Sequence, residues 1–590
     1  MAKSNHPHRH LLNINNQRLR VFQVITLGIC NAETASACCF KDGELIAAAS
    51  EERFSRIKMD ESFPIRSIEY VLGEAGVNLT DIDQVAYAWG KGFQEELLPT
   101  YVARAVELAE EDETALDIFS ERIRIETERD EANKNEFRDW FDEHFTAPGQ
   151  PPLITCFHHE AHAYSACLLS PYQRALVLTA DARGDYESVT CWLYDTASEP
   201  IIRKLYSSTS SDSPGFFYGR ITGLLGFKPC RHEGKITGLA AHGDPKNAIG
   251  LMQEMIDFED GELKAKLGDL YRPFYTNYSD ALKNEISRYS REDIAAAAQQ
   301  HLEDLLCKIV VHACEKHEIK DIPLVCAGGV FGNVKANQAL KELPHVKQMF
   351  IQPQMGDGGL CLGAAAYAQH SAGLKISPMT HVYLGPSIDV DEINKQPDDV
   401  LQKITVEQPE NTVDELVEDL SSDKVVGLVR GRMEFGPRAL CNRSILYKTS
   451  DQSCNKLLNE RLHRTEFMPF APVTTVELAE KAFIGFLESD ITFNFMTSTV
   501  NCTDEFSGKC SAVTHIDGTA RPHVIRKDSD PFMWDVIKQW FEKTGEYALI
   551  NTSFNTHEEP IICAVDDALK ILLNGTIDVL YVESQRVSLR

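Results

Sequence analysis

The sequence lacks several patterns that would place it in a common class of protein. Its 16 cysteines include no pair separated by two residues, which argues against a zinc ribbon. It contains no secretory hydrophobic segment and no run of about 18 apolar residues, so neither a signal peptide nor a membrane span is predicted. Many scattered thiols without an export signal favour a cytoplasmic protein.

Positive charge is also scarce. The chain has 59 Lys and Arg residues against 88 Asp and Glu residues, and its formal net charge is -29. Broad electrostatic attachment to nucleic acid or to an anionic membrane requires clustered positive charge, so neither partner is expected. A phosphate-bearing ligand would therefore have to be held by a local site within the fold.

The composition is otherwise that of a globular protein, with 590 residues, of which 43% are hydrophobic and 25% charged. Predicted strands alternate with predicted helices throughout, which indicates an α/β fold. Asp42-Gly43 between two apolar runs predicts a tight hairpin near the N-terminus. Residues 101–145 are charged with a helical period, which predicts helix with one exposed face, and residues 292–317 predict a long amphipathic helix.

Glycine and proline interrupt this pattern at residues 371–385, where we place a linker between two domains. We expect a flexible tail over residues 1–23, a first domain over 24–370 and a second domain over 386–590. The second domain is expected to contain strands at 425–429, 548–550 and 579–582, and helices at 412–421, 533–544 and 565–573.

The sharpest motif is Phe157-His158-His159-Glu160-Ala161-His162. On a helix, His158 and His162 lie one turn apart on the same face, within reach of one metal ion. His159 and His162 form a competing pair, and histidines near a helix start can instead cap the helix or pack. The order of residues does not match the His-Glu-x-x-His motif of metalloproteases.

Two aspartates stand at positions suited to the same chemistry. Asp181 ends the predicted strand 175–180, and Asp357 lies in a glycine-lined turn before a helix of small residues. Aspartates in such places often serve only a turn or a helix N-cap. A carboxylate there can also be an oxygen ligand for a cation.

Residues 325–337 run from a strand through glycines into a helix. Glycines allow close backbone approach, and a helix N-terminus offers N–H groups to phosphate. The segment matches neither the P-loop nor the G-x-G-x-x-G fingerprint.

The C-terminal part adds a second set of polar residues. Arg438 and Arg443 follow a predicted strand in a Gly- and Pro-containing segment, and their paired N–H groups could clamp phosphoryl oxygens. A surface salt bridge is the commoner role of any single arginine. In a chain this acidic, arginines within apolar loops favour an internal anion site.

Together these strings resemble the NodU/CmcH family of O-carbamoyltransferases, from about residue 24 to the end. The most specific strings are HHEAHAYSA, AGGVFGNVKAN, MGDGGLCLGAAAY, EFGPRALCNRSIL, MPFAP, HIDGTARP and NTSFN. The family joins an actin-like domain of the ASKHA type, a duplicated ribonuclease-H-like fold, to a YrdC-like α/β domain.

The resemblance implies a two-step reaction. The second domain would condense carbamoyl phosphate with ATP, supplied with Mg²⁺, into carbamoyl adenylate and pyrophosphate. The first domain would pass the carbamoyl group to a hydroxyl of a natural product or sugar, as in antibiotic or secondary-metabolite biosynthesis. The implied metal is Fe(II), although Mn(II) and Zn(II) also suit two histidines and two aspartates. A homodimer is left open.

The resemblance also assigns residues. The metal ligands would be His158, His162, Asp181 and Asp357. The nucleotide side of the first domain would comprise Lys58, Lys235, Gly328, Gly329, Asn333 and Gly358. The carbamoyl-phosphate and ATP site of the second domain would comprise Arg438, Arg443, Arg464, Asn551 and Ser553. The catalytic residues would be His158, His162, Asp181 and Arg438.

The sequence departs from the family at two places. Many relatives have His-Asp where this chain has Glu33-Thr34, which bears on the acceptor side, and many have arginine where this chain has Met468. One alternative is therefore a nucleotide-binding scaffold without activity. A protein-thiol acceptor, as in hydrogenase maturation, is disfavoured because that type carries Cys-x-x-Cys pairs and an acylphosphatase domain. A tRNA acceptor is disfavoured because no basic face is evident.

Overall fold

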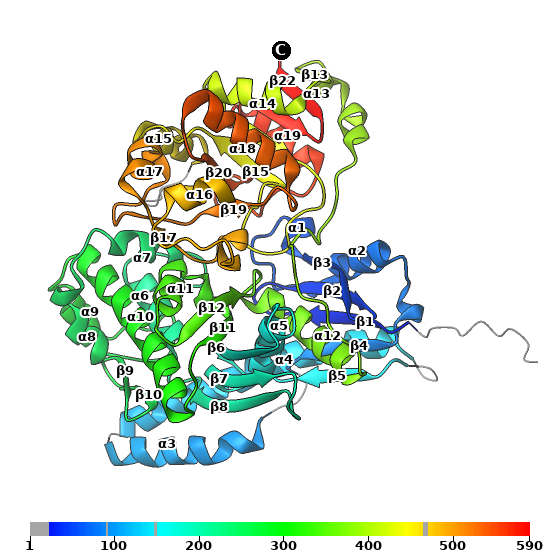
Figure 1. Cartoon of the computed structure of the whole chain (residues 1–590). Helices are drawn as coiled ribbons and strands as arrows, with labels where there is room; N and C mark the ends of the chain where they lie inside the picture. The colour runs from blue at the N-terminus through cyan, green and yellow to red at the C-terminus, as the bar shows by residue number, and fades with distance from the viewer. Residues whose placement is uncertain (1–22, 90–92, 112, 147–149, 464–469) are drawn as a thin grey trace, which may run out of the picture.

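The structure is a computed structural model of the chain, and it describes residues 23–89, 93–111, 113–146, 150–463 and 470–590. Figure 1 shows two parts stacked on each other, with the N-terminal part below and the C-terminal part above. Three large β-sheets organise the described residues, two with five strands and one with eight. The predicted α/β class is therefore confirmed.

The first sheet has the strand order β3-β2-β1-β4-β5. Its strands are β1 (Ile25–Cys30), β2 (Ser36–Lys41), β3 (Glu44–Ser50), β4 (Gln84–Ala88) and β5 (Leu153–Cys156). β1 pairs antiparallel with β2 and parallel with β4. The predicted hairpin between β2 and β3 is confirmed, and Asp42 (φ 52°) and Gly43 (φ 85°) both adopt the left-handed backbone that such a turn requires.

The second sheet repeats this arrangement, with the order β12-β11-β6-β7-β8. Its strands are β6 (Arg174–Gly184), β7 (Glu187–Asp195), β8 (Ile202–Thr209), β11 (Ile322–Ala327) and β12 (Val346–Ile351). In both sheets the first three strands pair antiparallel in succession, the fourth pairs parallel with the first, and the fifth pairs parallel with the fourth. This repeated topology is the duplicated, actin-like arrangement that the resemblance implies.

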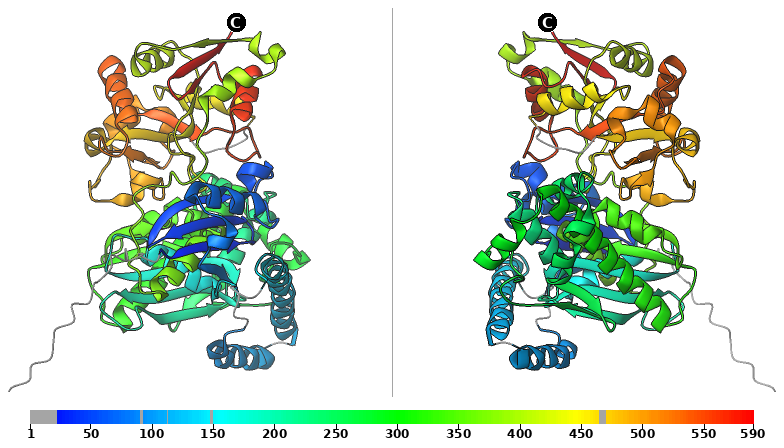
Figure 2. Two further views of the ribbon diagram at one scale, coloured as in Figure 1. Left: turned by 90° about the vertical axis from the view of Figure 1, so that its right-hand side faces the viewer. Right: turned by 90° about the vertical axis from the view of Figure 1, so that its left-hand side faces the viewer.

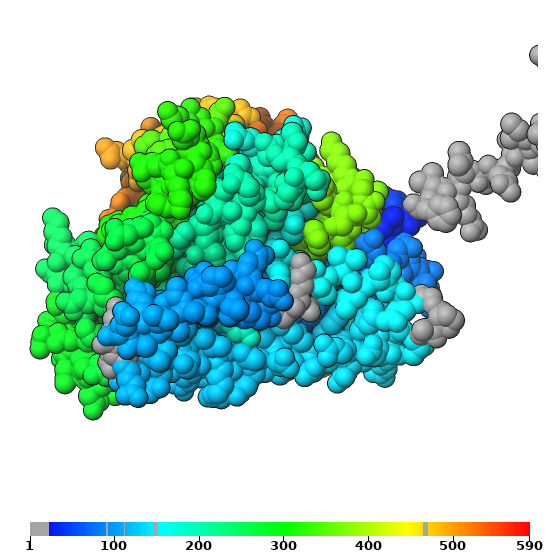
Figure 3. Space-filling model, turned by 90° about the horizontal axis from the view of Figure 1, so that it is seen from below, coloured from blue at the N-terminus to red at the C-terminus, as the bar shows by residue number. Residues whose placement is uncertain are grey.

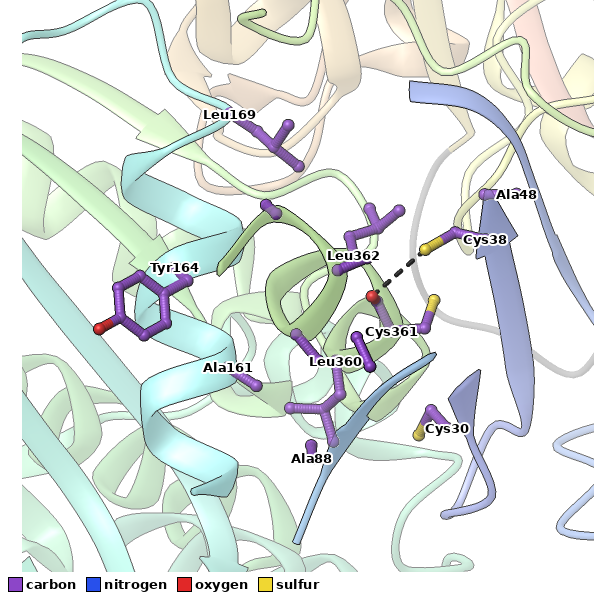
Figure 4. Close-up of a cluster of buried hydrophobic side chains, with 14 of the residues drawn as sticks. Cys30, Cys38, Ala48, Ala88, Ala161, Tyr164, Leu169, Leu360, Cys361 and Leu362 are labelled. Atoms are coloured by element: carbon purple, nitrogen blue, oxygen red, sulfur yellow. Dashed lines mark hydrogen bonds between the residues drawn. The ribbon is translucent and has the colours of Figure 1, made fainter. Parts of the chain in front are cut away.

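Two helices lie between these sheets, α5 (His158–Cys167) and α12 (Leu360–Ser371). α12 packs on β1, β2 and β4, α5 packs on β6, β7 and β11, and the two helices contact each other. A Cβ atom on Gly363 would lie only 1.8 Å from the Ala161 carbonyl oxygen, so the close helix contact requires glycine there. Figure 4 shows this core, in which the Cys38 thiol donates a hydrogen bond of 3.2 Å to the Cys361 carbonyl.

The charged segment predicted to be helical forms α3 (Leu98–Glu111) and α4 (Glu113–His144). These helices run across the lower face of the molecule, where Figure 3 shows them in blue and cyan. The long helix predicted over 292–317 is α10 (Arg291–Lys316), which packs on α7 (Glu233–Ala240) and α11 (Val334–Lys341).

The third sheet lies in the C-terminal part and has the order β13-β22-β21-β14-β15-β20-β16-β19. Its strands are β13 (Ile404–Glu407), β14 (Val426–Val429), β15 (Arg443–Tyr447), β16 (Ala471–Thr475), β19 (His523–Ile525), β20 (Leu549–Ser553), β21 (Val579–Val582) and β22 (Gln585–Leu589). The three predicted helices appear as α14 (Thr412–Ser421), α18 (Pro531–Thr544) and α19 (Val565–Leu573).

The connection between the two parts runs through residues 372–389, which contain no helix or strand beyond the isolated bridge of Tyr383 with Glu434. The predicted domain limits themselves stay a prediction. Polar contacts join the parts elsewhere as well. Arg56 donates a hydrogen bond of 2.7 Å to the Ile561 carbonyl, and Asn337 donates one of 2.7 Å to the Thr497 carbonyl.

Membrane insertion was not expected from the sequence. Across the part of the chain that the structure describes, none of the helices has both the length and the apolar composition that a bilayer span requires.

Candidate active site

The histidine motif lies at the start of α5, directly after β5. The helix begins with two supporting hydrogen bonds, because Phe157 N–H donates to the Glu160 carboxylate (3.0 Å) and His158 N–H donates to the Asp185 carboxylate (2.7 Å). His158 and His162 follow one turn apart, and their ring centroids lie 4.7 Å from each other. Both side chains are fully buried.

Two carboxylates meet these imidazoles. Asp181 lies near the C-terminal end of β6, and Asp357 opens a short 3-10 turn (Asp357–Gly359) that leads into α12. His162 Nε2 lies 3.4 Å from an Asp181 carboxylate oxygen and 3.8 Å from one of Asp357, and His158 Nε2 lies 3.8 Å from the same Asp357 oxygen. One ligand atom from each of the four residues lies within 4.8 Å of the others. We call these residues the four-ligand cluster.

The competing histidine pair is not brought together in this way. His159 Nδ1 lies 2.7 Å from the Thr179 hydroxyl, so its ring is engaged by β6 on another side of α5. His159 is not part of the group of possible metal ligands found among the described residues. Of the two spacings in the motif, the structure therefore joins the one with a full helical turn to the aspartates.

Burial and neighbouring charges shift the pKa values of the four-ligand cluster. Burial lowers the pKa of His158 well below its usual range, because the charged imidazolium loses its hydration. Burial also disfavours charge on His162, but the Asp181 and Asp357 carboxylates outweigh this and raise its pKa to about 8. Burial raises the pKa of Asp357. Protons and a cation would compete for these groups.

The residues present fit a divalent cation. All four ring nitrogens of His158 and His162 are buried, and no hydrogen bond is formed by them within the described residues. Buried polar atoms normally have partners, so such orphaned nitrogens indicate a ligand. Metal–ligand bonds of about 2.1 Å place ligand atoms at most about 4.2 Å apart, so a small contraction would complete the coordination.

The loop from Gly328 to Asn333 begins beside the cluster. Gly329 N–H donates a hydrogen bond of 2.8 Å to the Asp181 carboxylate, which orients that ligand. Gly328 has φ 113°, and a Cβ there would lie 2.1 Å from the Ala180 carbonyl oxygen, so only glycine fits. Asn333 caps α11 by accepting from Ala336 N–H, and its side chain also bonds to Gln299. These residues therefore fix the conformation of the loop. At Gly358, a Cβ atom would lie 2.2 Å from the side-chain nitrogen of Gln354.

The other end of this loop lines a cavity of about 290 Å³ at the junction of the two parts. The charged side chains that line this cavity, which we call the chamber, are mainly basic. The basic ones are Lys58, Arg231, His232, Lys235, Arg438, Arg521 and His557. Among its described lining residues, Glu558 is the one acidic side chain, and it already pairs with His232 (2.9 Å) and Arg231 (3.5 Å).

Arg438 is the residue of the chamber that most clearly indicates the charge of its ligand. Its Nη2 donates to the Gly332 carbonyl (3.2 Å), while its Nε is buried and makes no hydrogen bond to the described residues. Burial lowers its pKa to about 10, and no carboxylate offsets that effect. A buried guanidinium without a counter-charge suits an anionic ligand.

Arg443 differs from Arg438 although both belong to one string. Arg443 is fully buried, and its guanidinium donates to the carbonyls of Arg430 (2.7 Å), Asn442 (2.8 Å), Pro386 (2.9 Å) and Gly431 (3.2 Å). It does not line the chamber. Its role at the phosphate site stays a prediction, whereas in the structure its donors hold the polypeptide backbone.

The remaining predicted residues divide between the chamber and its surroundings. Lys58, Lys235, Asn551 and Ser553 all line the chamber. The Asn551 amide donates a hydrogen bond of 3.0 Å to the Ala439 carbonyl. The side-chain oxygen of Asn551 is buried and accepts no hydrogen bond from the described residues. Arg464 and Met468 lie outside the described residues.

Sequence reasoning missed several side chains of the site. Arg521 stands inside the quoted string HIDGTARP, so the string itself could have suggested it, whereas Arg231 and His557 carry no such signal.

Glu33 comes near the cluster from the β1–β2 connection, is one-third exposed, and has a carboxylate oxygen 3.7 Å from Arg129 Nη2. Burial, followed by the charge of Asp357, raises the pKa of Glu33 to about 7.

Comparison with protein families covers most of the chain. The family described as "Carbamoyltransferase N-terminus" matches residues 26–366, and "Carbamoyltransferase C-terminus" matches residues 417–588. The nodulation protein NolNO of Sinorhizobium fredii is 30% identical over 563 residues, which cover 94% of this chain and 79% of that protein. The 3'-hydroxymethylcephem-O-carbamoyltransferase of Amycolatopsis lactamdurans is 30% identical, over 73% of this chain and 78% of that enzyme.

Solved structures resemble the chain only distantly. HypF of T. kodakarensis is 12% identical and covers 60% of this chain and 48% of its own, with a TM-score of 0.32. A putative N-acetylglucosamine kinase of Chromobacterium violaceum is 12% identical and covers 58% of this chain and 99% of its own, with a TM-score of 0.27.

Proposed function

The chain belongs to the carbamoyltransferase family, and from that premise we propose that it makes carbamoyl adenylate from carbamoyl phosphate and ATP and transfers the carbamoyl group to a small-molecule hydroxyl. One observation carries the proposal. A cluster suited to a cation and a chamber suited to anions are joined by a single loop, Gly328–Asn333. An activated carbamoyl group formed at one site would thus have a short route to the other.

The chamber is suited to the first step. Arg438, Lys58 and Lys235 offer N–H groups to phosphoryl oxygens, and these charges would offset the charge that develops on departing pyrophosphate. Carbamoyl adenylate is a mixed anhydride that water hydrolyses, so a recessed chamber with a short route to the cluster would limit its loss before transfer. Asn551 and Ser553 add neutral hydrogen-bonding groups to the same wall.

The four-ligand cluster is suited to the second step. His158, His162, Asp181 and Asp357 would hold a divalent metal, for which Fe(II), Mn(II) and Zn(II) all suit two imidazoles and two carboxylates. When bound, such an ion supplies positive charge that offsets charge on a phosphate and polarises an acyl group. Gly329 N–H and Asp185, through the His158 N–H, hold the ligands in place.

The acceptor would approach from the exposed side of the cluster. Glu33 is one-third exposed and has a pKa raised to about 7 by burial and by Asp357, which suits a base that takes the proton of an attacking hydroxyl. A small-molecule acceptor is supported by the named cephem O-carbamoyltransferases to which the chain is similar.

Pyrophosphate release tests the proposal directly. Purified protein with ATP, Mg²⁺ and carbamoyl phosphate should release pyrophosphate, and omission of carbamoyl phosphate should abolish that release. The same reaction with a panel of hydroxylated small molecules should then yield a carbamate. A protein that releases no pyrophosphate under any of these conditions would be an inert scaffold, and the proposal would be wrong.

A further inference from the structure

Helix α4 connects both halves of the N-terminal part behind the four-ligand cluster. On the side of the first sheet, the Asn133 carbonyl accepts a hydrogen bond of 3.0 Å from Asn31, and Phe137 stacks on Tyr87 at 3.8 Å. On the side of the second sheet, the Glu126 carboxylate accepts one of 2.8 Å from Tyr186 N–H. Figure 2 shows this helix standing beside the sheets. α4 therefore packs against both sheets as well as forming part of the surface.

A buried cation, Arg183 of β6, packs against α4. Its Nη1 lies 2.6 Å from the Asp130 carboxylate and 3.8 Å from that of Glu126, and the Arg183 side chain is only 11% exposed. Asp130 and Glu126 are themselves buried and lie one turn apart on α4. Two buried carboxylates on a rigid helix restrict where this guanidinium can lie.

Arg183 lies near the cluster. It follows Asp181 by two residues on β6, in a stretch where the pairing of β6 with β7 is irregular. Lys134, one turn from Asp130 on α4, lies 3.7 Å from the Asp185 carboxylate, and that carboxylate accepts the hydrogen bond from His158 N–H. Its charge also acts on the cluster: burial raises the pKa of Asp357 and of Glu33, and the Arg183 guanidinium opposes that rise at both carboxyls. The cation, the cluster and Glu33 therefore form one group of interacting charges.

Resting on the proposed function, we propose that Arg183 is a further residue of the transfer site, where its guanidinium pairs with the phosphate of the adenylate. Asp130 and Glu126 are positioning residues that hold it there. In the transfer, the acceptor oxygen bonds to the carbamoyl carbon, and the bond from that carbon to the phosphate oxygen breaks. The electron pair leaves with AMP, and the acceptor proton passes to Glu33. The phosphate gains a negative charge in this step, so a fixed guanidinium stabilises the product side more than the starting state.

Arg183→Met tests the role of the cation, with Arg124→Met as a matched control. Arg124 lies on α4, is 59% exposed and pairs only with exposed Glu128 among the described residues. In the metal-loaded enzyme, R183M should slow carbamoyl transfer about 100-fold and weaken product inhibition by AMP about 10-fold. Pyrophosphate release and the bound metal per chain, measured by elemental analysis, should stay within about twofold of wild type. R124M should change none of these.

Arg183→Lys and Asp130→Asn keep the proposal testable if R183M does not fold. R183K retains the charge and should recover about a tenth of the wild-type transfer rate. D130N should slow transfer about 10-fold, and the D130N/R183M double variant should be no slower than R183M, because the two residues act as one unit.

Three results would overturn the assignment of Arg183. They are transfer at the wild-type rate in R183M, loss of metal in parallel with loss of transfer, and an R183K variant no faster than R183M. All three require a wild-type enzyme that releases pyrophosphate. A wild-type protein that releases none would instead refute the proposed function itself.

Discussion

The four-ligand cluster and the chamber are built on opposite principles. The cluster gathers two imidazoles and two carboxylates within 4.8 Å, all from the N-terminal part, and its orphaned nitrogens suit a cation. The chamber gathers basic side chains from both parts around about 290 Å³, and its unpaired guanidinium suits an anion. One chain thus holds a group of residues suited to a cation and a cavity suited to an anion. The loop Gly328–Asn333 contacts both, at Asp181 and at the chamber.

The largest expected effect comes from removing the buried cation of the chamber. Arg438→Ala should lower carbamoyl-phosphate-dependent pyrophosphate release by about 1,000-fold, because no other described group replaces its uncompensated charge. Arg526→Ala, which removes a cation paired with exposed Glu488 outside the chamber, should leave the rate unchanged. Equal losses in both variants would mean that the chamber is not the anion site.

The second effect separates the two sites. His158→Ala should abolish metal binding and slow carbamoyl transfer more than about 100-fold, while pyrophosphate release stays near that of wild type. His159→Ala removes an equally buried imidazole from the same helix but outside the cluster, so it should retain the metal. If H158A stops pyrophosphate release as well, the two sites are not independent.

The third effect distinguishes two arginines of one string. Arg443→Met strands several buried carbonyl oxygens and should lower the free energy of unfolding by about 3 kcal/mol, seen as a lower thermal midpoint. R438A should leave the midpoint nearly unchanged, since its loss removes one long hydrogen bond. A stable R443M with normal pyrophosphate release would contradict the structural role assigned to Arg443.

The smallest effect concerns the pH dependence of stability in metal-free protein. Because burial and Asp357 raise the pKa of Glu33 to about 7, the folded state binds its proton more tightly than the unfolded state does. Stability should therefore fall as pH rises from about 4.5 to 7, by about 1 kcal/mol once solvent screening of this partly exposed group is allowed for. Glu33→Gln should remove that slope.

Glu61→Gln is the control for this titration. Glu61 also contacts Arg129, at 3.4 Å, but it is 62% exposed, so its removal should leave the slope as in wild type. If the free energy of unfolding still falls between about pH 4.5 and 7 in E33Q, another carboxyl near the cluster is the titrating group.

Local patterns predicted a large part of the fold and of the cluster. The Asp42-Gly43 turn, the 412–421 helix and the 579–582 strand appear where the sequence places them, because turn chemistry and apolar periodicity act over a few residues. The spacing of His158 and His162 likewise predicted that both would lie on one helix face.

Local patterns did not separate the basic residues from one another. The string that contains Arg438 and Arg443 predicted the same role for both, yet Arg438 lines a cavity and Arg443 donates to backbone carbonyls. Periodicity predicts which face of an element a residue occupies, but it does not predict what that face meets. The charged pattern of residues 101–145 predicted one exposed face of the helix, but it did not predict that Glu126 and Asp130 are buried against Arg183.

The family, the helical histidine pair and the aspartates that could join it can be inferred from short strings and their order. Tertiary contacts bring Asp181 and Asp357 to that pair, leave Arg438 without a counter-charge and place α4 behind the site. Loss of hydration and pairing of charges depend on which distant segments pack together, and no local pattern encodes those contacts.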